Sequence, residues 1–507
     1  MNLTPLVRPW FLHKASRPMS WRGRVEEVQR AQLDMLMARG GRTKWGVSVG
    51  LDKGRGYEGL LRAVPAPQAY PDIRELTMRM ISGEPDVLWP GVTRRFAQSS
   101  GTSDGKSKYI PITADSLRLN HYEGGTQVVA QYLRLYPDSR LFAGKGFILG
   151  GSYANELSLP RGVMVGDLSA TLIDCINPLV NLARVPSKRV ALMADWEEKL
   201  PALIEASLRE DVTNISGVPS WFLTVLKGVM ERAGVGCIHD VWPNLEVFFH
   251  GGISMLPYFG QYAKITRPDM RYLESYNASE GFFAVQDTVE SRAMLLLLES
   301  GTFYEFIPLS ELDSDRPRAV PAWEVEEGEV YSLVITSCNG LWRYTPGDTV
   351  RVESVDPLRI TIAGRTKCFI NAFGEELMVE NAEAAMTRVC HEMGCEVVNY
   401  TAAPVYASDN SRGRHEWLIE FEREPESIEA FAEALDKALQ DVNSDYQAKR
   451  SHGIFLDRLT VVKGRRGVFN EWLAATGKLG GQRKVPRLAN DRKVMDKLIE
   501  MNLKFKI

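Results

Sequence analysis

Cysteine is scarce in this sequence, and the few cysteines present do not form a framework. There are six in 507 residues, and no two of them are arranged as a Cys-x-x-Cys pair. This scarcity excludes a disulfide-stabilised scaffold and a zinc ribbon. It is typical of a protein that works in a reducing compartment, so we expect a cytoplasmic protein.

Long apolar runs and an excess of either charge are also missing. The richest apolar stretch, residues 293–298, ends after six residues, whereas a helix that crosses a bilayer needs about 18. Lysine and arginine total 61 and aspartate and glutamate total 64, for a formal charge of −3. A nearly neutral chain has no broad basic surface for nucleic acid or anionic lipid. We therefore expect a small-molecule partner, with neither nucleic acid nor a membrane.

Acidic residues are absent from the first 25 positions, which carry five basic ones. An acid-poor basic leader is one mark of an organelle transit peptide, which also forms an amphipathic helix. Pro5, Pro9 and Pro18 predict that no such helix forms here, because a proline inside a helix removes a hydrogen bond. We therefore do not expect a transit peptide.

The sequence does contain short apolar runs that alternate with segments of helical spacing. The runs that predict buried strands are residues 147–150, 245–249, 294–298 and 331–336, and the helical segments include 196–209 and 221–233. Strands alternating with helices predict an α/β fold, here a large domain of mixed sheets with flanking helices.

After Gly364 the pattern becomes that of a compact α+β unit. Strands are expected at 397–401, 417–421 and 459–462. Between the last two, Phe431, Leu435 and Leu439 recur every four residues and predict an amphipathic helix. We expect a large domain over 1–363 and a smaller, mobile C-terminal domain over 364–507.

The most informative segment runs from Ser99 to Lys108, with the sequence SSGTSDGKSK. Glycines let backbone N–H groups approach an anion, hydroxyls donate to phosphate oxygens, and a lysine supplies counter-charge. The segment is not a Walker A motif, because only three residues separate Gly101 from Gly105 where that motif has four. Since Tyr109-Ile110-Pro111 reads as extended, we expect the loop to join two strands; a solvated Ser/Gly turn is the simpler alternative.

Continued through Tyr109-Ile110-Pro111, this segment resembles the phosphate loop of the acyl-adenylate-forming superfamily. Its extended form is similar to that of the plant auxin-responsive acyl-acid amido synthetase family and its bacterial relatives. The resemblance covers nearly the whole chain in order. It implies that the loop binds ATP and that Lys108 assists catalysis. The implied ATP-binding residues of the loop are Ser99, Ser100, Gly101, Thr102 and Ser103.

A strand at 248–250 runs into Gly251 and Gly252, where absent side chains would let a purine lie against the backbone. This resembles the adenine-proximal segment of the superfamily, although an ordinary strand end would have the same sequence. Further along, residues 276–280 look like the Tyr-x-x-Ser-Glu motif of the family. The resemblance implies that Ser275 and Tyr276 flank the adenine and that Glu280 holds Mg²⁺, for which a carboxylate is a suitable ligand. A capped helix N-terminus is the alternative.

Two further segments complete the set. Pro346-Gly347-Asp348 presents a carboxylate that can accept from two ribose hydroxyls. A family-like stretch begins at Gly364, where Arg365 can add a second ribose contact and the glycine beside charged residues suits a hinge. Taken alone, Pro-Gly-Asp is also a common turn. Near the C-terminus, Lys484 matches the catalytic lysine of the amido synthetases, with Lys478 as a second candidate and a solvated basic tail as the alternative.

The sequence therefore resembles an enzyme that adenylates a carboxylic acid with Mg-ATP and then transfers the acyl group to an amine, such as an amino acid. Two alternatives stay open: a thioester ligase that uses CoA, and a nucleotide-binding regulator without turnover. Scattered histidines and the lack of a Gly-x-Ser-x-Gly segment argue against zinc and hydrolase chemistry. His121, Tyr122 and Trp221 are guesses for the acyl-acid pocket, and the sequence does not predict the oligomeric state.

Overall fold

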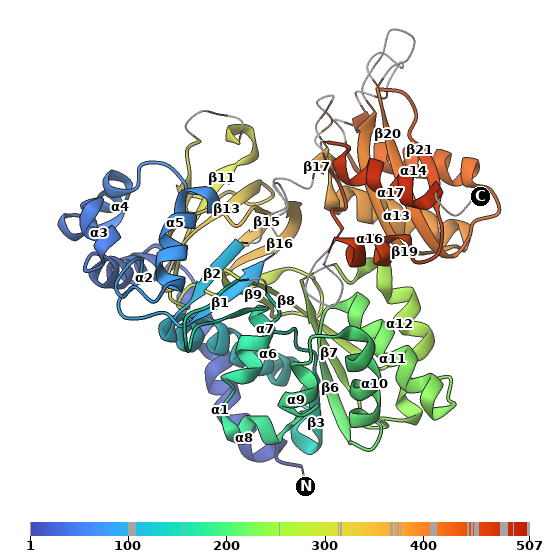
Figure 1. The fold of residues 1–507 in the computed structure, drawn as a ribbon, viewed down its shortest axis with the longest axis horizontal. Helices are drawn as coiled ribbons and strands as arrows, with labels where there is room; N and C mark the ends of the chain where they lie inside the picture. Colours follow the sequence, from blue (N-terminus) through green and yellow to red (C-terminus); the bar gives the residue numbers. More distant parts are fainter. Residues whose placement is uncertain are drawn as a thin grey trace. The chain divides into compact units, whose positions relative to one another are not determined.

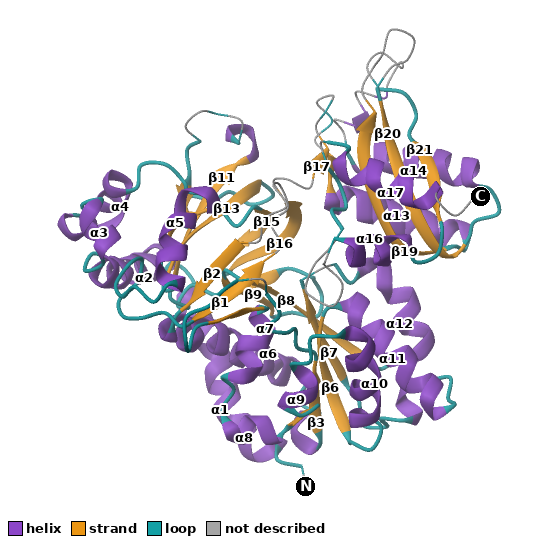
Figure 2. Ribbon diagram, in the orientation of Figure 1, coloured by secondary structure: helices purple, strands orange, loops and turns teal. Residues whose placement is uncertain are grey.

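The computed structural model describes most of the chain, in two compact units. The first unit contains most residues up to 361, and the second contains residues from 362 onwards together with Gly347–Thr349. Figures 1 and 2 show the helices and strands of each unit. The described residues are 2–99, 108–155, 157–252, 254–312, 314, 317–365, 369–370, 372, 375, 377–405, 413–443, 446–447, 450, 456–476, 485–489 and 491–503.

A large mixed sheet forms the body of the first unit, as the alternating pattern predicts. Its strands are, in spatial order, β12 (Val320–Pro321), β11 (Thr302–Pro308), β13 (Val330–Ser337), β15 (Asp348–Val355), β16 (Leu358–Arg365), β10 (Met294–Leu296), β9 (Gly281–Gln286), β8 (Arg271–Ala278), β7 (Val247–Gly251), β6 (Val212–Gly217), β3 (Lys145–Ile148) and β5 (Arg184–Val185), with β14 (Leu341–Tyr344) paired to β13. Neighbouring strands from β8 to β5 run parallel. The expected α/β class is confirmed.

Helices cover both faces of the parallel strands, because crossover connections place them there. Phe248 packs in the core with α10 (Trp196–Ser207), α11 (Pro219–Ala233) and α12 (Phe259–Ile265). Its neighbour Phe249 points to the other face, into the core with α6 (Tyr122–Leu135). Figure 1 shows these helices on either side of β6 and β7. The shorter helices nearby are α7 (Leu168–Asp174), α8 (Pro178–Leu182) and α9 (Lys188–Ala191).

The N-terminal region corrects one expectation. It forms α1 (Thr4–Ser16), with Pro5 in the first turn and Pro9 inside the helix. Proline is tolerated in the first turn because the N–H groups there have no partner within the helix. The helix is further held by Arg8, whose guanidinium donates to Leu133 O at 2.7 Å and Ser139 O at 3.1 Å beyond the end of α6. The remaining N-terminal helices are α2 (Val25–Gly40), α3 (Lys44–Ser48), α4 (Gly56–Ala63) and α5 (Tyr70–Ile81).

The second unit is the compact α+β unit expected after Gly364. Its sheet has the order β19 (Glu396–Val405), β20 (Arg414–Arg423) and β21 (Thr460–Gly464), beside the short pair β17 (Phe369–Ile370) and β18 (Leu377–Met378). Its helices are α13 (Val379–Met393), α14 (Ile428–Val442), α16 (Val468–Ala475) and α17 (Lys493–Leu503). Phe431, Leu435 and Leu439 of α14 are fully buried, as their spacing predicts.

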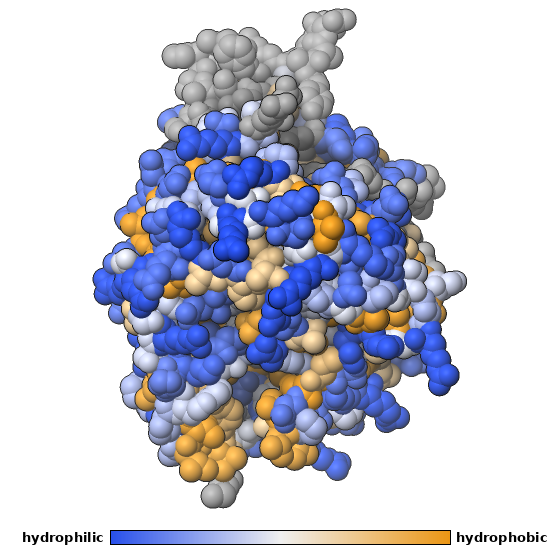
Figure 3. Space-filling view, turned by 90° about the vertical axis from the view of Figure 1, so that its left-hand side faces the viewer, coloured by the Kyte–Doolittle hydropathy of each residue, from blue (hydrophilic) through white to orange (hydrophobic). Residues whose placement is uncertain are grey.

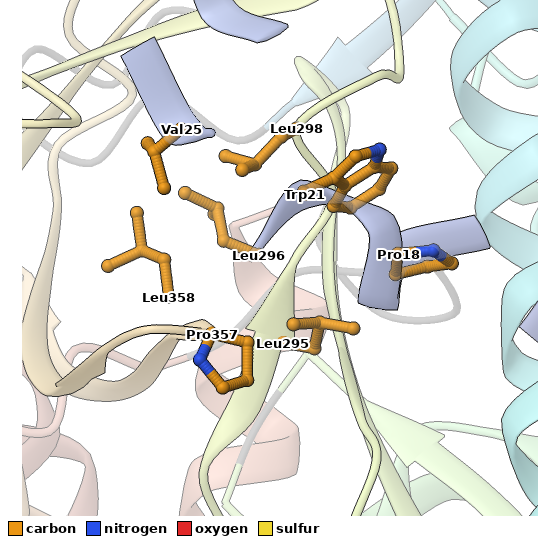
Figure 4. Close-up of a pocket in the computed structure, with 8 residues that line it drawn as sticks. All are labelled: Pro18, Trp21, Val25, Leu295, Leu296, Leu298, Pro357 and Leu358. Carbon is orange, nitrogen blue, oxygen red and sulfur yellow. The ribbon is translucent and has the colours of Figure 1, made fainter. Parts of the chain in front are cut away.

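The surface of the first unit has two apolar features. Exposed side chains gather on α1 and α8, among them Leu6, Trp10, Leu179 and Leu182, and Figure 3 shows apolar surface at the lower end of one face. A separate crevice lies between η1 (Arg17–Trp21), β10 and the start of β16 (Figure 4), and its lining carries no charged side chain. Within the described part of the chain, no helix is long and apolar enough to cross a bilayer.

Candidate functional site

The glycine- and serine-rich segment joins two strands, as expected from its sequence. β1 (Arg95–Ser99) and β2 (Lys108–Ile112) pair antiparallel, and Ser99 lies opposite Lys108. The amide of Tyr109 donates to the hydroxyl of Tyr70 at 2.9 Å, which ties this end of the hairpin to α5. Ser100, Gly101, Thr102 and Ser103 lie outside the described residues.

Gly251 and Ser275 meet at the carboxyl edge of the parallel strands. The two residues lie side by side in the pairing of β7 with β8, and the hydroxyl of Ser275 donates to His250 O at 3.4 Å. A Cβ on Gly251 would lie 2.4 Å from Ser275 O, so no other residue fits there without moving the strands. Gly252 follows with a φ of +79°, which also favours glycine. Ligands of open α/β sheets bind beyond this edge.

Tyr276 and Glu280 belong to one hairpin, and the alternative of a helix N-terminus is wrong. β8 and β9 pair antiparallel, with Ala278 opposite Gly281 and a turn at residues 279–280. The ring of Tyr276 is 4% exposed and packs edge-to-face on Phe283, with 5.0 Å between ring centroids. The hairpin therefore holds Tyr276 beside Ser275 and places Glu280 in the turn that follows.

Two asparagines that the sequence analysis did not single out hold this hairpin in place. Asn339 donates to the backbone carbonyl of Glu280 at 3.1 Å, and Asn120 accepts from the amide of Phe282 at 2.6 Å. Both asparagines are buried. Their role depends on chain segments brought together from far away, so no local pattern could have indicated it.

A cluster of ionisable side chains lies next to Gly251 and Ser275. His250 of β7 lies opposite Glu274 of β8, and Arg292 donates to Glu274 at 3.0 Å. Burial, with a smaller contribution from Arg292, lowers the pKa of His250 to about 3. Burial also raises the pKa of Glu274, against the opposing effect of Arg292. The imidazole is therefore neutral at physiological pH.

Asp348 and Arg365 lie at the same end of a second hairpin. β15 and β16 are neighbours joined by the two residues 356–357, so Asp348, which begins β15, and Arg365, which ends β16, lie at the same end of the pair. At this end of the pair, a Cβ on Gly364 would lie 3.6 Å from the Thr349 hydroxyl. Asp348 is buried. The backbone therefore brings together the two residues that the resemblance assigns to the ribose.

The remaining expected residues are not all brought together. Lys484 and Lys478 lie outside the described residues. His121 and Tyr122 pack on the α6 side of the sheet, whereas Trp221, on α11, packs edge-to-face on Trp196 with 4.6 Å between centroids. The imidazole of His121 is buried and has no hydrogen-bond partner among the described residues, and burial lowers its pKa to about 4.

Sequence profiles of one family match three parts of the chain. They are the GH3 family N-terminal domain over residues 20–269, the central domain over 295–365 and the C-terminal domain over 380–493. The chain belongs to the GH3 family. This membership confirms the resemblance noted in the sequence.

Curated GH3 relatives are plant enzymes that match part of the chain. The indole-3-acetic acid-amido synthetase GH3.3 of Arabidopsis thaliana is 23% identical over 321 residues, which cover 58% of this chain and 52% of the relative. The jasmonoyl–L-amino acid synthetase JAR4 of Nicotiana attenuata is 28% identical over 268 residues, or 50% and 45%. The chain thus spans about half the length of these relatives.

Solved structures resemble the fold of this chain over almost its whole length. A GH3.15 acyl acid amido synthetase has a TM-score of 0.77 at 17% identity and covers 94% of this chain and 93% of its own. A 2-hydroxyisobutyryl-CoA ligase in complex with 2-HIB-AMP has a TM-score of 0.57 at 13% identity, covering 93% and 90%. These likenesses establish the fold.

Proposed function

We propose that this GH3 protein is an ATP-dependent acyl-acid amido synthetase. It joins a carboxylic acid to AMP with release of pyrophosphate, and an amine, such as that of an amino acid, then attacks the acyl carbon and expels AMP. Linking the acid to AMP makes AMP the leaving group of the second step. That step then needs only a correctly placed neutral amine.

The observation that carries this proposal is the grouping at the carboxyl edge of the parallel strands. Gly251 packs closely against Ser275, Tyr276 follows on the same strand, and Glu280 lies in the next turn. A flat base needs close approach to backbone, and the phosphates need a cation nearby. This arrangement supports adenine binding by Gly251, Gly252, Ser275 and Tyr276.

Glu280 would hold Mg²⁺ in this proposal. Within the described residues no group of three or more histidine, cysteine or acidic side chains could hold a metal by itself. Mg²⁺ fits such a site, because it commonly binds through one or two carboxylates together with phosphate oxygens and water. The ion would neutralise charge on the phosphates of ATP.

The other roles follow the family resemblance. Residues Ser99–Ser103 and Lys108 would bind the phosphates, and Asp348 and Arg365 would bind the ribose. Lys484 would offset the charge that develops at the α-phosphorus, as part of a mobile C-terminal domain over 364–507. We also infer a cytoplasmic protein, as the scarcity of cysteine suggests.

Pyrophosphate exchange with a panel of carboxylic acids tests the proposal. We expect labelled pyrophosphate to enter ATP only when an acid is present, because adenylation is reversible. The acyl adenylate is then offered amino acids or CoA. Amide formation supports the amido synthetase, thioester formation with CoA alone supports the ligase alternative, and ATP binding without any exchange supports the regulator.

A further inference from the structure

A buried lysine lies beneath the loop that follows β3. Lys199, on α10, is 1% exposed, and its ammonium group donates to Gly150 O at 2.6 Å, Gly151 O at 3.3 Å and Met193 O at 3.1 Å. An ammonium group has three protons and no acceptor. All three are therefore used on backbone carbonyls, two of them in this one loop.

The same loop is held from its other side by α7 and the residue before it. Gly151 N donates to the Ser169 hydroxyl at 2.8 Å, and Ser152 N donates to Asp167 Oδ2 at 2.7 Å. Asp167 N donates back to Ser152 O at 2.8 Å. The carbonyls of residues 150, 151 and 152 thus all have partners outside the loop. The amides of residues 151 and 152 do as well.

Close packing fixes the loop as well. A Cβ on Gly150 would lie 2.5 Å from Ile173 Cδ1, and one on Gly151 would lie 2.1 Å from Asp167 Oδ2. Burial lowers the pKa of Lys199 to about 8, with Asp167 acting in the opposite direction. Burying a charged amine costs free energy unless the amine is hydrogen-bonded. The buried ammonium group of Lys199 therefore depends on the carbonyls that it binds.

The location of the loop connects it to the candidate site. Ile148 ends β3 beside Ser216 of β6, in the same parallel set as Gly251 and Ser275, so the loop starts at the carboxyl edge of these strands. The next residue is Tyr153, and burial raises the pKa of its hydroxyl to about 12, with an opposing contribution from a hydrogen bond with Thr171 of α7. Ligands of open α/β sheets bind beyond this edge, so the loop borders the region where a ligand is expected.

We propose that Lys199 is a positioning residue that, with Asp167 and Ser169, fixes residues 150–153 as a wall of the acyl-acid pocket. This inference rests on the proposed function and names the part of the site that selects the acid. Lys199 touches no substrate in this role. It acts by setting the position of the loop backbone, which lines the pocket.

Substitution of Lys199 tests the inference by separating KM from kcat in pyrophosphate exchange. In Lys199→Met the loop carbonyls lose their donors, so the KM for the acid should rise about tenfold to a hundredfold, while kcat and the KM for ATP stay within about twofold of wild type. In the wild-type enzyme the KM for the acid should also rise above a pH of about 8, where the amine loses a proton. In Lys199→Arg this rise should be absent, because guanidinium keeps its charge.

Two further variants keep the outcome decisive. Ser169→Ala removes a single partner of Gly151 and should raise the same KM by a few fold even if Lys199→Met does not fold. Lys145→Met, at the opposite end of β3, loses only its pairing with Glu210 at 2.8 Å and should leave that KM unchanged. If the wild-type enzyme catalyses exchange and both Lys199→Met and Ser169→Ala keep its KM for the acid, the role of Lys199 is overturned while the proposed function stands. Absence of exchange in the wild-type enzyme would overturn the proposed function with it.

Discussion

At the scale of single residues, burial sets the charge of several groups, and sequence alone could not reveal it. His121 and His250 look like any other histidines in the sequence. In the fold, burial lowers their pKa values to about 4 and about 3. Lys199 likewise sits in an ordinary helical pattern, and its three carbonyl partners come from two separate loops.

The buried histidines predict a loss of stability in acid. An unfolded histidine has a pKa of about 6.5, whereas burial lowers the pKa of His121 in the fold to about 4. Between these two pH values the histidine is protonated in the unfolded state and neutral in the folded state. The unfolded state therefore binds more protons in this window, and the free energy of unfolding should fall as pH falls through it. Denaturant unfolding of His121→Phe between pH 6 and 4.5 should show a slope smaller by about 1.4 kcal/mol per pH unit.

Glu280 offers a test of the metal assignment that spares the fold. Its backbone carbonyl, rather than its side chain, receives the hydrogen bond from Asn339, so Glu280→Gln should keep the hairpin. Loss of the carboxylate should lower the adenylation rate by about a hundredfold to a thousandfold, the range for losing one electrostatic stabiliser. Exchange rates at varied Mg²⁺ and thermal unfolding measure the two effects. Normal exchange with an unchanged dependence on Mg²⁺ would refute the assignment.

At the scale of elements, spacing predicted the type of most segments but not what ends them. The helix expected at 196–209 is α10 (Trp196–Ser207), and the strand expected at 147–150 is β3 (Lys145–Ile148). That strand ends earlier because Gly150 and Gly151 leave the sheet to meet Lys199. The helix α1 forms despite Pro5 and Pro9, since Arg8 anchors it to α6.

The pairing of β7 with β8 predicts a specific effect of substitution at Gly251. A Cβ there would lie 2.4 Å from Ser275 O, so Gly251→Ala must separate the strands and should cost about 1 to 3 kcal/mol of stability. It should also raise the KM for ATP, because Ser275 and Tyr276 would move. Gly260→Ala is the matched control, since no atom of the described residues lies within 4 Å of a Cβ at that position in α12. Equal melting temperatures for the two variants would contradict the tight pairing.

At the scale of the whole molecule, each of the two units has its own hydrophobic core. One cluster of the first unit includes Phe249 and Leu273, and one of the second includes Trp417 and Leu435. A unit with its own core can unfold by itself, so a single two-state transition is not expected.

Leu435→Ala should destabilise the second unit selectively. The side chain is fully buried on α14, and removal of its methyl groups should cost about 2 to 5 kcal/mol. Calorimetry should show one transition lowered in temperature and another unchanged. The parallel variant Leu273→Ala, fully within the first unit, should produce the reverse pattern. A single transition shifted equally by both variants would contradict independent cores.

The sequence by itself determined the fold class, the family and the strand-to-strand nature of the loop between Ser99 and Lys108. These depend on local spacing and on the order of short motifs, which are properties of the sequence and need no tertiary contact. Only the tertiary structure decided that residues 276–281 form a hairpin rather than a helix start, that Asn120 and Asn339 hold it, and that Lys199 fixes the loop after β3. Such roles arise from hydrogen bonds and burial between residues far apart in the chain, and those contacts exist only after the sheet has assembled.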